Sequence, residues 1–122
     1  MDTLRTQGLQ SVPLTTIETF EALDIRVGTI VRAEAFPEAR KPAIKLWIDF
    51  GELGIKQSSA QITVRYNPEI LIGKQAVAVV NFPPRIIAGF RSECLILGAT
   101  NENADVVLLK PDSEVPNGLK IA

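Results

Sequence analysis

The sequence predicts an all-β fold, a small five-stranded barrel with a short helix between its third and fourth strands. Apolar runs of strand length follow one another, the early ones alternate apolar with polar residues, and proline or glycine separates them. With 122 residues and 46 % hydrophobic content, the chain can close one core without a metal or disulfide. We therefore expect a flexible arm over residues 1–14 and one domain over residues 15–122.

A helix and a strand are expected at the start of this domain. TTIETF has the threonine-to-glutamate spacing of a capping box and predicts a short helix over about 16–22. DIRVGTIVRAEA (24–35) alternates as a strand does, and Gly28 in its interior suits a bulge or a sharp bend. The alternation places Val31 on the more apolar face of this strand and Ile30 on the face with the arginines.

The next two strands follow along the chain. A third strand is expected near residues 59–65, with Ile62 and Val64 directed inward. The second strand, AIKLWIDFG, alternates more clearly. Its outward positions hold Lys45, Trp47 and Asp49, and its inward positions hold Ile44, Leu46, Ile48 and Phe50.

The remaining elements complete a barrel. NPEILIG predicts a helical segment in which Asn67 is the cap, Pro68 the first helical residue and Gly73 the end. AVAVV (76–80) and CLILG (94–98) predict the fourth and fifth strands, and VVLL further on predicts a sixth.

This order is the pattern of the OB fold, a Greek-key barrel named for oligonucleotide and oligosaccharide binding, here with N- and C-terminal extensions. An SH3-like barrel or a short sandwich is the alternative, and the helix after the third strand favours the OB fold. Ligands of OB folds bind across the second and third strands, between two loops. In this chain those loops are residues 36–42 and 81–93.

The residue types exclude much enzyme chemistry. The chain has no histidine, and it has neither a phosphate-binding glycine loop nor a nucleophile elbow. Cys94 is its single cysteine and lies in an apolar run, which predicts a buried, inert thiol. No apolar run has the length of a membrane span and no leader pattern is present. We expect a cytoplasmic protein without membrane insertion that is not an enzyme and uses no metal or cofactor.

The net charge of −1 is unevenly distributed. Residues 26–91 carry a net charge of +5, whereas residues 1–25 and 92–122 each carry −3. A basic middle between acidic ends indicates a face of positive potential that attracts phosphates. Ordinary solvated surface charge is the alternative.

The connection NFPPRIIAGFRSE (81–93) combines apolar and basic residues. Two successive prolines cannot lie in a central strand, so this segment predicts a loop. Loops run over the surface, where apolar side chains gain little, unless the ligand is itself apolar, as an unfolded polypeptide is. We therefore predict that Phe82, Ile86, Ile87 and Phe90 bind peptide. The alternative is that Phe82 and Ile87 are buried in the barrel while Ile86 and Phe90 contact a second subunit.

A nucleic acid is the other ligand that this pattern supports. OB folds hold a single strand by positive charge along its backbone and by aromatic side chains that stack on its bases. Trp47 is the expected stacking residue, unless it folds over the barrel end or into a dimer contact. For Lys45 and Arg65, plain solvated charge is the alternative. The predicted RNA-binding residues are Lys45, Trp47, Arg65, Asn81, Arg85, Arg91 and Ser92.

Most of the chain resembles a known family. DIRVG, NFPP and GFRS are similar to segments of the tRNA-binding OB-domain family, which includes free-standing tRNA-binding proteins and C-terminal extensions of some methionyl- and tyrosyl-tRNA synthetases. The resemblance covers residues 18–122, and within the family the CsaA-type export-related chaperones are most similar. The tRNA-binding members have glycine and methionine where this chain has Cys94 and Leu95, a departure that CsaA-type chains share.

The resemblance implies partners as well as fold. CsaA-type members are described as homodimers that bind unfolded or exported preproteins and present them to the protein-translocation machinery. Their dimer contacts would fall on the helix at 15–22 and on the tail over 105–122. The resemblance implies a chaperone-like polypeptide binder, with a tRNA-binding protein as the alternative and an assembly module that binds no client as the third. The family's motif is matched at Asn81, Pro84, Arg85, Gly89 and Ser92.

Overall fold

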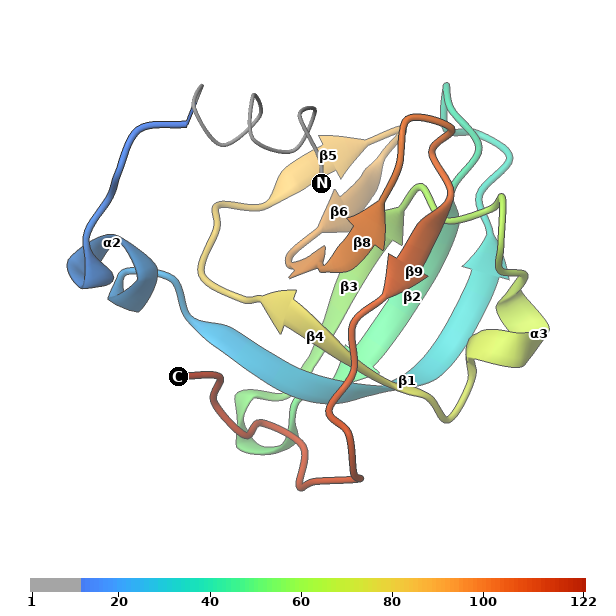
Figure 1. Ribbon diagram of the computed structural model, residues 1–122. Helices are drawn as coiled ribbons and strands as arrows, with labels where there is room; N and C mark the ends of the chain where they lie inside the picture. The colour runs from blue at the N-terminus through green and yellow to red at the C-terminus, as the bar shows by residue number, and fades with distance from the viewer. Residues whose placement is uncertain (1–11) are drawn as a thin grey trace.

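Five antiparallel strands curl into a barrel in the computed structural model, which describes residues 12–122 (Figure 1). Their spatial order is β3-β2-β1-β4-β7, with β1 at the centre and β7 next to β4. This confirms the predicted OB fold. Most of the expected arm over residues 1–14 lies outside the described residues. The five strands are β1 (Ile25–Ala35), β2 (Ile44–Asp49), β3 (Ile55–Ala60), β4 (Gln75–Val79) and β7 (Leu95–Ile96).

Hydrogen bonds between β3 and the segment that enters β7 close the barrel. The Glu93 amide donates to the Gln57 carbonyl at 2.8 Å, and the Gln57 amide donates to Glu93 Oε1 at 2.9 Å. The buried Ser58 hydroxyl donates to the Cys94 carbonyl at 2.9 Å. At this seam, side-chain hydrogen bonds replace some of the backbone bonds between strands. The last strand, β7, can therefore be short.

The barrel interior contains the inward residues that the alternation of β2 predicted. Ile44, Leu46, Ile48 and Phe50 are all at most 2 % exposed. Cys94 is also buried, as predicted, and this burial raises the pKa of its thiol to about 12. The thiol is therefore protonated at neutral pH and is a poor nucleophile.

β1 contains a bulge at Val31. Its register with β2 shifts between Ile30, which pairs with Ile48, and Arg32, which pairs with Trp47. Ile30 is fully buried in the barrel interior, whereas Ile25 and Val27 belong to a second apolar cluster on the other face of β1. Val31 continues that other face and is 43 % exposed. The face predicted to carry the arginines is thus the one that enters the interior at Ile30, and the extra residue brings Ala33 onto the interior face as well.

Gly28 lies where β1 passes from one partner strand to another. β1 pairs with β4 over residues 25–29 and with β2 over residues 29–35. The bulge expected at Gly28 occurs at Val31 instead. At Gly28, β1 approaches β2 so closely that an added Cβ would lie 2.9 Å from the Asp49 carbonyl oxygen.

β3 lies earlier in the chain than predicted. The expected strand near residues 59–65 is found at Ile55–Ala60, after a short 3₁₀ turn, η1 (Gly51–Leu53). Ile62 is buried as predicted, but Val64 lies in a turn and is 63 % exposed. The sequence IKQSSA did not indicate a strand, because it does not alternate apolar with polar residues. Its polar side chains can lie in a strand here because hydrogen bonds satisfy them.

The long connection between β4 and β7 contains a hairpin, β5 (Arg85–Ile87) and β6 (Phe90–Ser92). Its two-residue turn consists of Ala88 and Gly89, with φ of 47° and 81°, as in a type I′ turn. The prediction of an irregular loop was therefore wrong for this part. The two prolines interrupt only the approach to β5.

The other predicted elements are present. α3 (Pro68–Leu71) is capped by Asn67, whose Oδ1 accepts a hydrogen bond from the Ile70 amide at 3.2 Å. The expected sixth strand is β9 (Val106–Leu108), which pairs with β8 (Gly98–Thr100) in a second hairpin.

The C-terminal tail covers the edge of β1 that β2 leaves free. Val27 donates to the Leu119 carbonyl at 2.9 Å and accepts from the Gly118 amide at 2.7 Å, and the Ile121 amide donates to the Ile25 carbonyl at 2.8 Å. Val115 and Ile121 also pack on a second apolar cluster, which consists of Ile25, Val27, Val77 and Val79. Much of the tail expected at a dimer interface thus contacts the chain's own barrel.

α2 (Ile17–Glu21) stands beside the barrel (Figure 1). Its N-cap is Thr16, which makes no side-chain capping bond, so the predicted capping box is not formed. The Thr15 hydroxyl donates instead to Thr19 Oγ1 at 2.9 Å. None of the helix residues is buried, and its apolar side chains are exposed.

Candidate functional site

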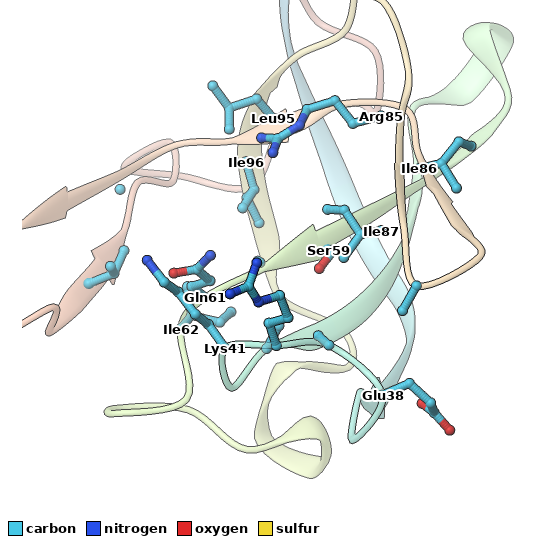
Figure 2. A pocket seen from close by; sticks show the side chains of 17 residues that line it. Glu38, Lys41, Ser59, Gln61, Ile62, Arg85, Ile86, Ile87, Leu95 and Ile96 are labelled. Atoms are coloured by element: carbon cyan, nitrogen blue, oxygen red, sulfur yellow. The ribbon is translucent and has the colours of Figure 1, made fainter.

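A pocket of about 1050 Å³ lies at one rim of the barrel, between the loop after β1 and the β5–β6 hairpin (Figure 2). We call it the rim pocket. It lies between the two loops that the OB fold uses for its ligands. Its walls are residues 38–41 of the first loop, residues 59–62 at the end of β3, residues 85–88 of the hairpin, and Leu95, Ile96, Gly98 and Val106.

Cationic and apolar side chains share the rim pocket. Arg40, Lys41 and Arg85 line it, and none of the three forms an ion pair with another residue of the described chain. Figure 2 shows Arg85 beside Leu95, across the pocket from Lys41. Ile86 is 65 % exposed. No aromatic side chain lines this pocket.

The structure brings together some of the predicted site residues in this pocket. Arg85, Ile86 and Ile87 line it, whereas the other predicted binding residues do not. Sequence reasoning did not assign Arg40 and Lys41 to the site, although both lie in the loop that the OB fold indicated. It also missed Ser59, Gln61, Leu95 and Ile96.

A second group of predicted residues lies on the outer face of β2. We call it the aromatic cluster. The Trp47 ring meets Phe90 edge-on at 5.7 Å between centroids, and Phe90 meets Phe36 in the same manner at 5.5 Å. The Arg32 guanidinium lies 4.1 Å from the Trp47 ring centroid, and Lys45 Nζ lies 4.8 Å from the Phe36 centroid. These cation–π contacts hold two basic side chains against the aromatic rings, and the Arg32 guanidinium also donates to the Glu34 carboxylate.

Gln57 ties the aromatic cluster to the hairpin. Its Oε1 accepts a hydrogen bond from Trp47 Nε1 at 3.0 Å, and its Nε2 donates to the Arg91 carbonyl at 2.9 Å. The Arg91 side chain is exposed, with its Nε 3.4 Å from Glu93 Oε2. This network fixes the indole against the barrel and leaves Arg91 at the surface beside it.

Four predicted residues lie outside the rim pocket and the aromatic cluster, and three of them have structural partners. Asn81 accepts from the Asp24 amide at 2.8 Å and donates to the Ala22 carbonyl at 2.9 Å, so it anchors the segment after α2. Ser92 Oγ accepts from the Ser59 amide at 3.1 Å at the barrel seam. Phe82 is 44 % exposed and lies outside the rim pocket.

Arg65 is the fourth of these residues, and it forms a two-pronged ion pair with Asp105. Both nitrogen–oxygen distances are 2.9 Å. The Arg65 hydrogen bond and charge lower the pKa of the Asp105 carboxyl. The pair joins the turn after β3 to the loop before β9, away from the rim pocket and the aromatic cluster.

Over residues 12–122, no cluster of three or more carboxylate or cysteine groups is placed to hold a metal ion. No helix in the same part is both long and apolar enough to cross a membrane.

An OB barrel with a rim pocket and a cationic aromatic face defines a binding domain of the nucleic-acid-binding class. Residues 25–120 match the family described as "Putative tRNA binding domain", and the chain belongs to this family.

Solved structures and sequence relatives agree with this family. The chaperone CsaA of Bacillus anthracis is 64 % identical, with a TM-score of 0.87, over 90 % of this chain and 100 % of that one. A CsaA chaperone protein of Picrophilus torridus is 52 % identical, with a TM-score of 0.82, over 89 % and 100 %. A methionine–tRNA ligase of Methanothrix thermoacetophila is 43 % identical over 94 % of this chain and 17 % of its own length. The chain thus spans less than a fifth of such ligases.

Proposed function

We propose that this protein is a CsaA-like chaperone that binds unfolded or exported polypeptides in the rim pocket, on a tRNA-binding OB scaffold. The composition of that pocket is the observation that carries the proposal. Exposed Ile86 and Leu95 lie among three cations and one acid, Glu38, and no aromatic side chain of the described residues lines the pocket for base stacking. An unfolded chain offers apolar side chains and free backbone, which such a surface accepts. Two similar structures are named chaperones, which supports the proposal.

tRNA binding is the second candidate function, and the family and the aromatic cluster favour it. Trp47, Lys45 and Arg91 supply a ring and two positive charges on one outer face. In this structure the Arg32 guanidinium covers a face of the Trp47 ring. A base can stack on that face only after Arg32 moves to a phosphate, which makes this mode of binding sensitive to salt.

Polypeptide and tRNA binding are expected to respond to different substitutions. Ile86→Ser with Leu95→Ser removes two half-exposed apolar side chains and should weaken binding of a labelled unfolded polypeptide about tenfold or more. Arg85→Ala with Arg91→Ala should instead weaken tRNA binding and reduce the slope of its salt dependence by about 2. Fluorescence titrations with both ligands at physiological salt measure these effects.

The exposed Ile72 provides the matched control for this pair of titrations. Ile72→Ser removes an apolar side chain of similar exposure that lies outside the rim pocket, and it should leave both affinities unchanged. Phe90 is avoided because it packs on Trp47 and Phe36, so its loss disturbs the hairpin itself. If wild-type protein captures neither ligand, the third alternative, an assembly module, replaces both candidates.

We further propose that the protein works as a cytoplasmic homodimer, without a cofactor, and delivers clients to the protein-translocation machinery. The apolar side chains of α2 are the support for the dimer. Ile17 and Phe20 of α2, and Leu14 just before it, are exposed within the described chain. Exposed apolar residues clustered in this way mark association surfaces.

The mass in solution tests the dimer. Light scattering should give twice the 13.3 kDa mass of the chain. Ile17→Asp with Phe20→Asp places charges at the expected contact and should give a monomer. A wild-type particle with the mass of one chain contradicts the proposal.

A further inference from the structure

The outer edge of β5 is a free strand edge beside the rim pocket. Within residues 12–122, β6 is the one strand that pairs with β5. When a two-residue turn closes a hairpin, the flanking residues exchange both hydrogen bonds, and bonded pairs recur at every second position. Ile87 with Phe90 and Arg85 with Ser92 are therefore the bonded pairs. The amide and carbonyl of Ile86 point away from β6, and no hydrogen bond joins them to another residue of the described chain.

We propose that an extended polypeptide segment adds to β5 as a third strand and forms hydrogen bonds with the backbone of Ile86. This inference rests on the proposed polypeptide-binding function and specifies how the ligand is held. Strand addition obtains affinity from backbone bonds, whereas pockets that receive alternate side chains give specificity. Both components are present here, because Arg85, Ile86 and Ile87 also line the rim pocket.

The alternation of β5 determines which side chains of the added strand reach the rim pocket. Figure 2 shows the side chains of Arg85 and Ile87 on one side of the strand and that of Ile86 on the other, and all three border the rim pocket. An added strand alternates in the same way, so every second side chain faces the pocket. Leu95 and Ile96 there favour apolar side chains, and the cations favour an acidic one. We infer a segment with apolar residues at alternate positions and an acidic residue among them.

The chemistry of the edge favours polypeptide over RNA. A strand edge offers alternating N–H and C=O groups, which match another backbone and not a sugar–phosphate chain. RNA recognition by OB folds relies on aromatic stacking, and the rim pocket has no aromatic side chain. Its positive charge alone would attract phosphates, so RNA is retained as an outcome of the test.

Pro84 keeps this edge short. Its outward backbone position carries no N–H, so Ile86 is the only outward donor within β5 itself. A long bare edge would pair with copies of itself, and proline next to a short edge prevents this. The same restriction limits the bound ligand to a few bonded residues, which suits sequence-tolerant and reversible capture.

The test compares two substitutions at Ile86. Ile86→Pro removes the amide donor without touching a bonded pair of the hairpin, whereas Ile86→Val keeps the donor and a branched side chain. The probe is a short dye-labelled peptide of alternating valine and serine with one glutamate. We expect Ile86→Pro to bind it about tenfold more weakly than Ile86→Val. N-methylation of the backbone amides at alternate positions of the peptide should cause a similar loss with wild-type protein.

Amide hydrogen exchange of wild-type protein gives a reading that does not depend on how a variant folds. Saturation with the peptide should slow exchange at Ile86 and change Arg85 and Ile87 little, since those amides are already bonded. Unchanged exchange at Ile86, or no effect of N-methylation while the peptide still binds, overturns strand addition and leaves polypeptide binding in place. If the peptide does not bind, or if tRNA alone protects Ile86, both proposals are overturned.

Discussion

Gly28→Ala is expected to lower the free energy of unfolding by about 3 kcal/mol, as overpacking of a core does. A Cβ at this position would lie 2.6 Å from Ile48 Cγ2, 2.8 Å from Phe50 Cδ1 and 2.9 Å from the Asp49 carbonyl oxygen. The Ile48 and Phe50 side chains are fully buried, and the carbonyl belongs to β2, so none of these atoms can move without displacing a strand. Urea denaturation followed by Trp47 fluorescence measures the change.

Val31→Ala is the control in the same strand. Val31 is 43 % exposed at the bulge, so its truncation should cost less than about 1 kcal/mol. The double variant Gly28→Ala with Ile48→Ala should not recover wild-type stability, because the Asp49 carbonyl still lies in the way. Equal stability of Gly28→Ala and Val31→Ala would show that β1 and β2 do not approach this closely.

The sequence predicted those parts of the fold in which the local pattern agrees with the final environment. The alternation of β2 matched its burial residue by residue, and Asn67 with Pro68 marked the start of α3. The pattern failed in β1, because that strand packs on both faces, with Ile30 in the barrel interior and Ile25 and Val27 under the C-terminal tail. It failed again at β3, whose inward Ser58 is satisfied by the Cys94 carbonyl, a partner distant in the sequence.

The residues of the candidate sites were likewise predictable only in part. The position of the diproline connection after β4 located Arg85, Ile86 and Ile87 beside the loop that carries Arg40 and Lys41. Ser59 and Gln61 were not predicted as site residues, because the sequence pattern placed the third strand later in the chain than β3 lies. The contact between Trp47 and Phe90 was not predictable from either local pattern, since it depends on the hairpin folding back over β2.

At the C-terminal tail, as at Gly28, the close approach of two backbone segments determines stability. The tail forms backbone bonds to Val27 and Ile25 and an isolated antiparallel bridge between Lys120 and Arg26 of β1. Its approach to η1 is equally close, because an added Cβ at Gly118 would lie 2.5 Å from the Phe50 carbonyl oxygen. Gly118 also has a φ of +91°, which side chains rarely adopt. A side chain at position 118 would therefore lower stability for two independent reasons, backbone strain and overlap with the Phe50 carbonyl oxygen.

Gly118→Ala is expected to release the tail from β1 and to lower the free energy of unfolding by about 3 kcal/mol, the sum of backbone strain and overlap. Gly73→Ala separates these two terms. Gly73 has the same φ of +91°, but nothing lies within 4 Å of an added Cβ, so it should cost about 1 kcal/mol. The difference between the two variants measures the contact with the Phe50 carbonyl.

Hydrogen exchange shows whether the loss is local to the tail. In Gly118→Ala, the amides of Val27 and Ile121 should exchange faster, because their bonds join β1 to the tail. Amides in the β1–β2 ladder should stay protected and exchange faster only to the extent that global stability falls, since that pairing lies beyond the tail. Release also uncovers Ile25 and Val79, so binding of a hydrophobic dye should rise in Gly118→Ala and not in Gly73→Ala. Equal exchange and equal stability in the two variants would mean that the tail does not dock on the barrel in solution.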